Sequence, residues 1–373
     1  MPKGARGILI NSNSYLRRSN MQYDYREVVP YLLHWFEYNA RILAWRENPN
    51  PYYVWVSEIM LQQTRVEAVK GYFDRFIAEL PDIRALADAE EDKLLKLWEG
   101  LGYYNRVRNM KKAAVMVMEE YGGEMPGNYE KLLALPGIGE YTAGAISSIA
   151  FGLPVPAVDG NVLRVMKRIA GSFDDITKDA VKKELWGDIK EIIPRDNPSK
   201  FNQALMELGA IICLPGGKPL CDTCPVMHLC RAFHEGTTMQ IPVKPPKKER
   251  RKEDRTVLLL EYQDRYAIRR RLAKGLLAGL WELPGITRRM DGEEMEGYLS
   301  AQGMVAEQVG NLGEAKHIFS HVEWNMTGYH VLLKELPQEY TKDNAIVWAD
   351  RAEINERYSI PSAFAAFTKT IKD

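Results

Sequence analysis

Four cysteines, Cys213, Cys221, Cys224 and Cys230, are the only cysteines in this chain of 373 residues. Their spacing, C-x7-C-x2-C-x5-C, brings together four soft ligands suited to an iron–sulfur cluster or to zinc. Disulfides are the weaker interpretation, because a disulfide framework distributes its cysteines through a small secreted domain. Zinc sites usually pair two C-x2-C hooks and only one is present, so the spacing favours an iron–sulfur cluster and leaves zinc open.

A second informative segment, LLALPGIGEYTAGAI, places Gly137 and Gly139 in a tight turn between two helical stretches. The backbone N–H groups that begin the second helix are then free to bind an anion such as a phosphate. An ordinary turn between helices has the same residues, so this segment alone leaves both interpretations open.

Asp159 follows in PVPAVDGNVLRV, at the start of an apolar helix. An Asp in that position caps a helix by accepting hydrogen bonds from backbone N–H groups. A catalytic carboxylate could stand there equally well, so Asp159 gains a functional interpretation only from the turn that precedes it.

Together, the L-P-G-x-G-x-Y-T-A turn, the trailing Asp159 and the four cysteines resemble the helix-hairpin-helix DNA glycosylase superfamily of endonuclease III. Residues 30–235, and PYYVWVSEIMLQQTRVEAVKGYFDRF in particular, are similar to the MutY family of adenine-specific glycosylases. The resemblance implies that Gly137 and Gly139 bind DNA phosphate and that the cysteines hold a 4Fe-4S cluster. The first cysteine gap has seven residues, one more than the family pattern, in a loop containing Gly216 and Gly217 that can absorb it.

Glu58 lies in V-S-E-I-M-L-Q-Q-T, where its neighbours Val56, Ile59 and Met60 are apolar. Those neighbours predict a carboxylate in or against a core, where burial raises its pKa toward the range of a general acid. A surface ion pair is the alternative from the residues alone. By resemblance, Glu58 protonates adenine at N7 and Asp159 stabilises the sugar cation or a covalent adduct.

Tyr141 occupies the hairpin position at which strand-cleaving relatives carry a Lys for Schiff-base attack. Without an amine, efficient lyase chemistry is not expected. The resemblance therefore implies a monofunctional glycosylase, in which Tyr141 assists near Glu58 and water completes hydrolysis.

The resemblance also assigns substrate contacts. Because the target base must leave the helix, the enzyme has to fill the gap and hold the opposite strand. Arg106 and Arg108 follow Tyr103 in the segment GLGYYNRVRN and are expected to reach DNA phosphates. The assigned residues are Arg46, Trp45 (after an Ala where the family has Pro) and Gln203 for the adenine pocket, Gln63 and Tyr103 as wedge and intercalating residues, and Thr64 and Leu101 for the lesion pocket.

The elements that position these residues fall into two regions. Helical periodicity dominates from Tyr25 to about His234, which predicts an all-α block. A Pro-containing basic segment around 242–252 then predicts an exposed linker. The expected organisation is an N-terminal extension at 1–24, a helix-hairpin-helix glycosylase domain at 25–235 with the cluster loop at 213–230, a linker at 236–255, and a smaller Nudix-like α+β domain at 256–373.

In the second region, TVLLLEY and YAIRRR flank Gln263-Asp264 as a predicted hairpin, and KHIFSHVEW and GYHVLLKEL are predicted to be further strands. The segment GLLAGLWELPG resembles a Nudix domain, but the acidic R-E-x-x-E-E box is missing. Glu293 and Glu294 therefore predict a solvated helix start rather than a Mg²⁺ site. By resemblance to MutY proteins the domain reads 8-oxoguanine through an H-x-F-S-H loop containing Phe319, Ser320 and His321.

The charge composition and the absence of long apolar runs limit the partners and the location to be expected. Lysine plus arginine and aspartate plus glutamate both number 50, so a polyanion must be bound by local patches. Neither a signal peptide nor a membrane-spanning run is visible, and the expected location is cytoplasmic. We expect a monomer that acts on double-stranded DNA containing A:8-oxoguanine or A:G pairs.

Two alternatives remain from sequence. One is a thymine or uracil mismatch glycosylase, whose relatives can also carry Tyr at the hairpin position. The other is a non-catalytic Fe–S DNA-binding protein on the same scaffold. The F-S-H loop argues against the first, and the presence of both Glu58 and Asp159 argues against the second.

Overall fold

The computed structural model describes residues 23–246, 249–337 and 346–372, so most of the predicted N-terminal extension lies outside the described residues. Its contacts divide the chain into two compact units. Unit 1 is Met1–Ile59 with Met125–Pro246, and unit 2 is Met60–Glu124 with Lys247–Asp373. The division falls within one helix, α4 (Pro51–Leu61). No helix among the described residues is long and apolar enough to cross a membrane.

Unit 1 is helical, as its periodicity predicts. Its core is formed by apolar residues of α2, α11, α12 and α13, among them Leu32, Val165, Leu185 and Leu205. Its elements are α2 (Val28–Asn39), α3 (Ala44–Glu47), α9 (Tyr129–Ala134), α10 (Glu140–Ile149), α11 (Gly160–Ala170), α12 (Asp179–Ile192), α13 (Pro198–Ile211), η1 (Cys221–Thr223), η2 (Met227–Leu229) and α14 (Arg231–His234).

Helix α10 begins after the predicted glycine turn and packs closely against the segment that leads to Asp159. A Cβ atom on Gly144 would lie 2.0 Å from the carbonyl oxygen of Pro156. Only glycine permits this approach between the helix and the backbone. The sequence between the hairpin and Asp159 is thereby held against α10.

Unit 2 contains four helices from the first half of the chain and a seven-stranded sheet from the second. The helices are α5 (Val66–Glu79), α6 (Ile83–Asp88), α7 (Glu91–Leu97) and α8 (Asn105–Tyr121), and α8 packs against α6 and α7. The helical region predicted from Tyr25 to about His234 is not one continuous run here, because the chain turns between α4, which ends at Leu61, and α5, which begins at Val66.

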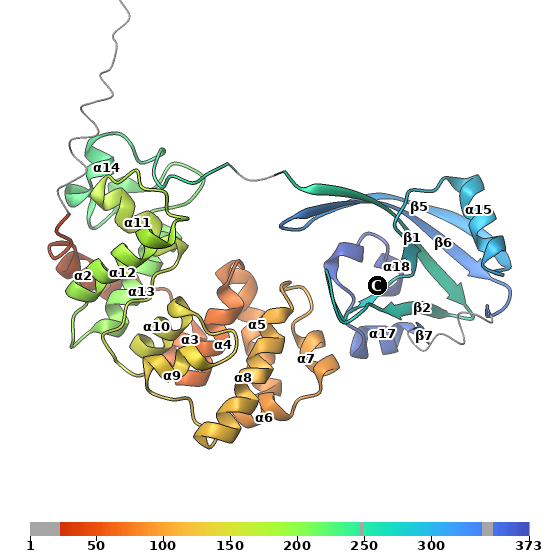
Figure 1. Ribbon diagram of the computed structural model, residues 1–373, viewed down its shortest axis with the longest axis horizontal. Coiled ribbons are helices and arrows are strands. Elements are labelled where there is room, and N and C mark those ends of the chain that lie inside the picture. The colour runs from red at the N-terminus through yellow and green to blue at the C-terminus, as the bar shows by residue number, and fades with distance from the viewer. Residues whose placement is uncertain (1–22, 247–248, 338–345, 373) are drawn as a thin grey trace, which may run out of the picture. The chain divides into compact units, whose positions relative to one another are not determined.

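The sheet has the order β3-β2-β1-β6-β5, with β4 paired to β1 and β7 to β2. Strands β1 and β6 are parallel and the other pairs are antiparallel. In Figure 1, β1, β5 and β6 run side by side as long ribbons. The strands are β1 (Arg251–Tyr262), β2 (Arg265–Arg270), β3 (Trp281–Glu282), β4 (Gly285–Ile286), β5 (Ala306–Ile318), β6 (Val322–Leu333) and β7 (Ile346–Ala349).

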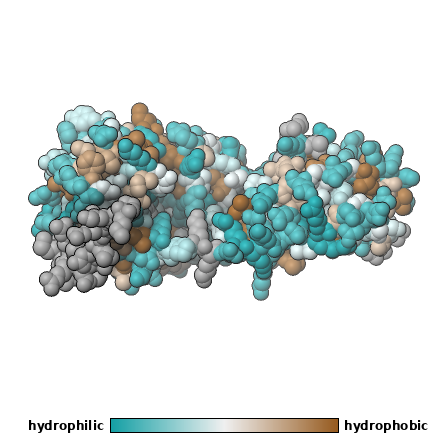
Figure 2. Space-filling model, turned by 90° about the horizontal axis from the view of Figure 1, so that it is seen from above, coloured by the Kyte–Doolittle hydropathy of each residue, from teal (hydrophilic) through white to brown (hydrophobic). Residues whose placement is uncertain are grey.

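Both faces of this sheet are covered by apolar side chains. One face packs Trp324, Phe364 and Phe367 beside α17 (Arg351–Arg357), η3 (Ser362–Phe364) and α18 (Lys369–Lys372). The other packs Leu258 and Met295 beneath α15 (Gly292–Ala301). Figure 1 shows α15 and the pair α17 and α18 on different sides of the sheet. The surface in view in Figure 2 is mainly hydrophilic, with hydrophobic residues in small separate groups.

The hairpin at Gln263-Asp264 is confirmed, and both residues have the positive φ of a two-residue turn. The predicted strand KHIFSHVEW is wrong, because β5 ends at Ile318, β6 begins at Val322 and the F-S-H residues form the turn between them. The Phe319 N–H donates to the carbonyl oxygen of Val322 at 2.8 Å and closes this turn. Strand β1 begins at Arg251, inside the segment predicted to be linker.

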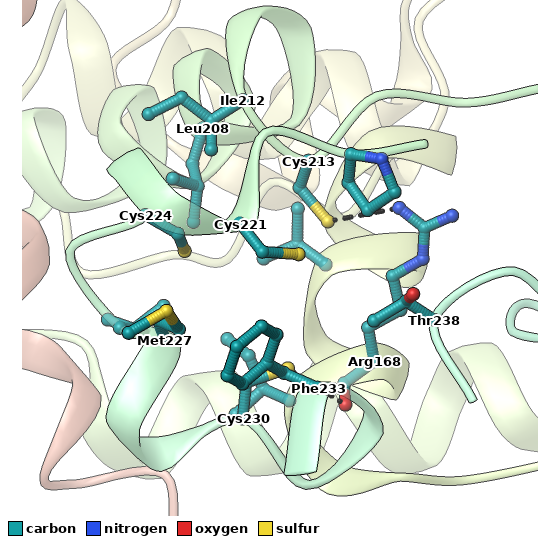
Figure 3. A pocket seen from close by; sticks show the side chains of 14 residues that line it. Arg168, Leu208, Ile212, Cys213, Cys221, Cys224, Met227, Cys230, Phe233 and Thr238 are labelled. Carbon is teal, nitrogen blue, oxygen red and sulfur yellow. Dashed lines mark hydrogen bonds between the residues drawn. The ribbon is translucent and has the colours of Figure 1, made fainter. Parts of the chain in front are cut away.

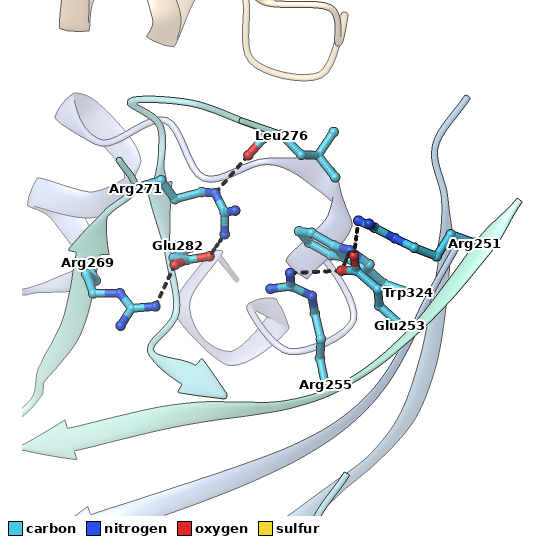
Figure 4. Close-up of polar contacts among 8 residues, drawn as sticks. All are labelled: Arg251, Glu253, Arg255, Arg269, Arg271, Leu276, Glu282 and Trp324. Atoms are coloured by element: carbon cyan, nitrogen blue, oxygen red, sulfur yellow. Dashed lines mark hydrogen bonds and ion pairs between the residues drawn. The ribbon is translucent and has the colours of Figure 1, made fainter. Parts of the chain in front are cut away.

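Glu253 and Glu282 each form ion pairs with two arginines of the same sheet or of the loop that follows β2 (Figure 4). Glu282 accepts hydrogen bonds from Arg269, at 2.8 Å, and from Arg271, and Arg271 also donates to the carbonyl oxygen of Leu276. Glu253 binds Arg251, Arg255 and the Trp324 indole N–H. These contacts tie the loop after β2 to the sheet.

Candidate active site

Glu58 and Tyr141 form the centre of the candidate site in unit 1. Glu58 projects from α4 and is only 6% exposed, as its apolar neighbours predict. The Tyr141 hydroxyl, from the first turn of α10, donates to Glu58 Oε2 at 2.5 Å. Burial raises the pKa of Glu58 to about 7, with the Tyr141 hydrogen bond acting in the opposite direction. A carboxyl group with this pKa can supply a proton near neutral pH.

Asp159 is the N-cap of α11, which confirms the predicted helix-capping role. Its catalytic role stays a prediction. Its Oδ1 accepts the backbone N–H groups of Asn161, at 2.9 Å, and Val162, at 2.7 Å. Burial raises the pKa of Asp159, whereas these donors favour the ionised form. The same carboxylate is close enough to raise the pKa of Glu58, which places two carboxyl groups in one site.

A chain of side-chain hydrogen bonds connects Asp159 with the cysteine segment. Asn161 Nδ2 donates to Asp159 Oδ2 at 2.7 Å, and Arg164 Nη2 donates to Asn161 Oδ1 at 3.0 Å. Arg164 Nε then donates to the carbonyl oxygen of Cys213 at 2.8 Å. The position of the cysteine segment is therefore coupled to the orientation of Asp159.

Glu207 is a site residue that the sequence analysis missed, together with its partner Arg41. Glu207 projects from α13 with a side chain 1% exposed. It accepts hydrogen bonds from Arg41 Nε at 2.7 Å, Arg41 Nη2 at 2.8 Å and Arg46 Nη2 at 2.7 Å. Although burial acts to raise it, these two guanidinium groups hold the pKa of Glu207 at about 2. Only its position one turn after Gln203, in an otherwise apolar run, signalled it.

The predicted adenine-pocket residues are placed around this ion-pair group. Arg46 lies in α3, binds Glu207 and sits 5.4 Å from the centroid of the Phe36 ring. Trp45 is almost completely buried. Gln203 is partly buried on α13 and donates to the Ser199 hydroxyl at 3.1 Å. Arg46 is thus held by a carboxylate, Trp45 by packing and Gln203 within its own helix.

The predicted phosphate-binding turn has the expected geometry. Gly137 has φ of +79, and Gly139 is the N-cap of α10 with no side chain to cap it. A side chain on Gly139 would meet nothing within 4 Å. The turn is consequently open at the helix N-terminus, where N–H groups favour an anion.

The four cysteines line a common pocket with apolar residues that include Leu208, Ile212 and Phe233 (Figure 3). They come from the loop just after α13, from η1 and its C-cap, and from the residue before α14. Arg168 Nη1 donates to Cys213 Sγ at 3.3 Å, which is a suitable neighbour for an anionic cluster of thiolates. Four thiols, an apolar lining and a buried guanidinium fit an iron–sulfur cluster.

Within the part of the chain that the structure describes, no three His, Cys, Asp or Glu side chains are close enough to bind a single metal ion. The four cysteines thus line one pocket without forming an assembled ligand set. All four are free thiols, so the disulfide interpretation has no support here.

Unit 2 holds the residues predicted to enter DNA and to contact the opposite base. Gln63 has φ of +62 and Tyr103, which is 49% exposed, has φ of +47. Thr64 closes the turn after α4 by donating its N–H to Leu61, and Leu101 is buried. The Tyr103 hydroxyl lies 3.0 Å from Ser320 Oγ.

In the F-S-H turn, Ser320 and His321 are exposed, whereas Phe319 packs inward. Its ring contacts His317 at 4.5 Å and Trp324 at 4.8 Å between centroids. Phe319 therefore anchors the turn, and Ser320 is exposed with its hydroxyl hydrogen-bonded to Tyr103. Glu294 joins Asp291 in a capping box and pairs with Arg288, which confirms the predicted solvated helix start.

Comparisons with known proteins identify the families to which the two parts of the chain are similar. Residues 56–191 match the HhH-GPD superfamily of base excision DNA repair proteins, and residues 255–370 match the NUDIX domain family. Among solved structures, a thermostable thymine-DNA glycosylase is 30% identical with a TM-score of 0.51, covering 56% of this chain and 97% of that one. An endonuclease III–DNA complex is 27% identical with a TM-score of 0.50, covering 58% and 99%.

The fold and site thus define a helix-hairpin-helix base excision repair protein with an appended Nudix-type domain. Its curated relatives specify the class further. Adenine DNA glycosylase of Mus musculus is 36% identical over 82% of this chain and 70% of its own length. That of Buchnera aphidicola subsp. Baizongia pistaciae is 34% identical over 85% and 89%. The chain belongs to the adenine DNA glycosylase family.

Proposed function

We propose that this protein hydrolyses the N-glycosidic bond of adenine mispaired with 8-oxoguanine, or with guanine, in duplex DNA. The observation that carries the proposal is Glu58, a buried carboxyl group whose pKa is raised to about 7 and which is bound by Tyr141. Adenine is a poor leaving group, so its departure requires protonation by such a group.

The two carboxyl groups take separate roles. Protonated Glu58 donates its proton to N7 of the flipped adenine, and the C1′–N9 bond breaks with its electron pair going to the base. The hydrogen bonds to Asp159 from Asn161 and Val162 favour a carboxylate, which stabilises the positive charge left on the sugar. Water then adds at C1′ and gives its proton to the Glu58 carboxylate, which leaves an abasic site and restores the acid.

Tyr141 restricts the proposed reaction to base excision without strand cleavage. It occupies the hairpin position with a hydroxyl that is already bound to Glu58, and it provides no amine for a Schiff base. The abasic strand should therefore remain intact until it is treated with alkali.

The adenine pocket is formed by Arg46 and Gln203, with Glu207 and Arg41 holding Arg46 in place. Unit 2 would supply Gln63 and Tyr103 as the residues that enter the duplex, and Thr64, Leu101 and Ser320 as contacts to 8-oxoguanine. His321 follows Ser320 in the same exposed turn. We take the acting species to be a monomer.

Cys213, Cys221, Cys224 and Cys230 would hold a 4Fe-4S cluster. These four thiolates would hold such a group between the residues that follow α13 and those that precede α14, and the group would supply a redox-active centre there. Arg168, which contacts Cys213 Sγ, and Arg164, which contacts the Cys213 carbonyl oxygen, would hold one of these ligands in position.

The decisive experiment is single-turnover excision from duplexes with one A:8-oxoguanine, A:G or T:G pair, followed by alkali. Cleavage at adenine only after alkali supports the proposal. Breaks before alkali would contradict the role of Tyr141.

One competing function has a specific observation in its favour, because the thymine-DNA glycosylase structure matches over half of this chain. Excision at T:G in place of A:8-oxoguanine would establish it. Binding to every duplex without excision would instead indicate a non-catalytic DNA-binding protein.

A further inference from the structure

The turns that carry Gln63 and Tyr103 share an unusual backbone conformation. Both residues lie in the left-handed region, with φ of +62 and +47, which residues other than glycine seldom adopt. Such conformations persist only where the surrounding structure holds them. The two turns are separated by all of α5, α6 and α7 in sequence, so a shared support has to come from tertiary contacts.

Arg106, in the first turn of α8, provides that support. Its Nη1 donates to the carbonyl oxygens of Met60, at 3.2 Å, and Gln62, at 2.7 Å, directly before Gln63. Its Nη2 donates to those of Leu101, at 3.0 Å, and Gly102, at 3.1 Å, directly before Tyr103. Each terminal nitrogen of one guanidinium group therefore binds one of the two turns.

Aromatic contacts fix the guanidinium group between the turns. Its Cζ lies 5.3 Å from the centroid of the Trp98 ring and 5.6 Å from that of Tyr103. Trp98 Nε1 donates to the carbonyl oxygen of Gly102 at 3.1 Å. Burial lowers the pKa of Arg106 to about 10, which leaves it charged at neutral pH. The terminal nitrogens of Arg106 are directed to these carbonyl groups, so the structure gives no support to the expectation that Arg106 reaches DNA phosphates.

We propose that Arg106 is a positioning residue that joins the Gln63 turn to the Tyr103 turn and fixes the spacing of the two side chains that enter DNA. The inference rests on the proposed function, in that both side chains are taken to enter the duplex. A lysine has one nitrogen on a flexible stem and cannot reproduce a planar two-nitrogen fork. Arg106→Lys keeps the charge and removes the bridge.

The test compares Arg106→Lys with a matched control, Arg75→Lys. Arg75 is an exposed residue of α5 whose guanidinium lies over the Tyr72 ring at 4.7 Å. Arg106→Lys should slow single-turnover excision of adenine opposite 8-oxoguanine at least tenfold. At a temperature at which both variants are folded, its visible cluster absorption should match that of the control, which should react like the wild type. Arg106→Gln, which reaches one turn but not both, is a second variant if the lysine variant does not fold.

A double-mutant cycle separates positioning from general damage. In a Tyr103→Ala background, the fold reduction in excision rate caused by Arg106→Lys should be less than half of the reduction seen when Tyr103 is present. The reason is that the side chain positioned by Arg106 has been removed. Equal fold effects in both backgrounds, or wild-type rates for Arg106→Lys alone, would overturn the inference.

Hydrogen exchange gives a readout that does not depend on activity. Amides of residues 62–64 and 101–104 should exchange faster in Arg106→Lys than in Arg75→Lys, with the rest of the protein unchanged. Unchanged exchange in both turns would reject the inference even if the wild type proved inactive. Wild-type inactivity on every adenine duplex, with faster exchange in both turns, would reject the proposed function and retain the bridge.

Discussion

At the level of single residues, the raised pKa of Glu58 has consequences for both rate and stability. If protonated Glu58 is the general acid, excision should fall tenfold per unit above about pH 7, its pKa, and should level off below it until Asp159, whose carboxylate is also required, becomes protonated. Glu58→Gln should abolish excision while mismatch binding survives. Single-turnover rates between acidic and alkaline pH measure this, and a rate that rises through pH 7 would contradict the assignment.

The same shift predicts that Glu58 opposes folding once it ionises. Its pKa rises on folding from 4.5 to about 7, so stability decreases as pH rises through that window. The loss is on the order of 3 kcal/mol when complete. Glu58→Gln should therefore be more stable than the wild type at pH 8 and not at pH 4. Denaturant unfolding at both pH values provides the comparison, with Glu91→Gln, at an exposed site, as the control.

Local patterns revealed some of these residues and long-range pairing concealed others. Apolar neighbours of Glu58 indicated its burial, and the residue order around Asp159 indicated its cap. Glu207 and Arg41 are 166 positions apart in the chain, so nothing local marks either one as the partner of the other. The inward direction of Arg106 was missed for the same reason, since its acceptors are backbone carbonyl groups that a sequence pattern does not display.

At the level of elements, two substitutions of Asp159 can distinguish its role as the N-cap of α11 from its proposed role in catalysis. Asparagine caps a helix as well as aspartate, whereas alanine costs about 1 kcal/mol. Asp159→Asn should unfold at nearly the wild-type denaturant midpoint and yet lose excision, because it has no charge to stabilise the sugar cation. Asp159→Ala should lose both. Substantial excision by Asp159→Asn would reduce the role of Asp159 to that of a cap.

Helix α10 provides a second prediction, from its contact with Pro156. Gly144→Ala places a methyl group 2.0 Å from the Pro156 carbonyl oxygen, and the resulting overpacking should cost about 1–3 kcal/mol of stability. Gly187→Ala in α12 is the matched control, because nothing lies within 4 Å of its new methyl group. That control should be neutral or gain up to about 1 kcal/mol. Equal effects on thermal unfolding would contradict the close approach.

The F-S-H turn shows why one element was assigned incorrectly. KHIFSHVEW has the alternation of a strand, and no Gly or Pro marks a break within it. The turn is set instead by the Phe319 N–H to Val322 bond and by Phe319 packing on Trp324. Tertiary packing decides such a boundary, whereas the Gln263-Asp264 hairpin follows from local turn chemistry alone.

For the whole molecule, the topology was less accessible than the elements. Periodicity separates a helical region from a region of strands, but it does not specify that β1 pairs in parallel with β6 or that β7 pairs with β2. Nor does it indicate that Met60–Glu124 groups by contacts with Lys247–Asp373. These pairings join distant segments, and loop closure between distant segments leaves little local signal.

The balanced charge of the whole chain leads to a last prediction, on the salt dependence of DNA binding. Lysine plus arginine equals aspartate plus glutamate, and the Gly137–Gly139 turn would bind phosphate through neutral N–H groups. Counterion release follows the number of phosphates neutralised by cationic side chains, at about −0.9 in log K per log salt for each. We therefore expect a slope shallower than about −5 for a duplex carrying an abasic-site analogue, measured by titration at several salt concentrations. Lys218→Ala, in the exposed cysteine loop, should change it by about 1 if Lys218 contacts phosphate. A slope near −10 would mean that a broad basic surface holds the DNA, and the neutral hairpin would then be a minor contributor.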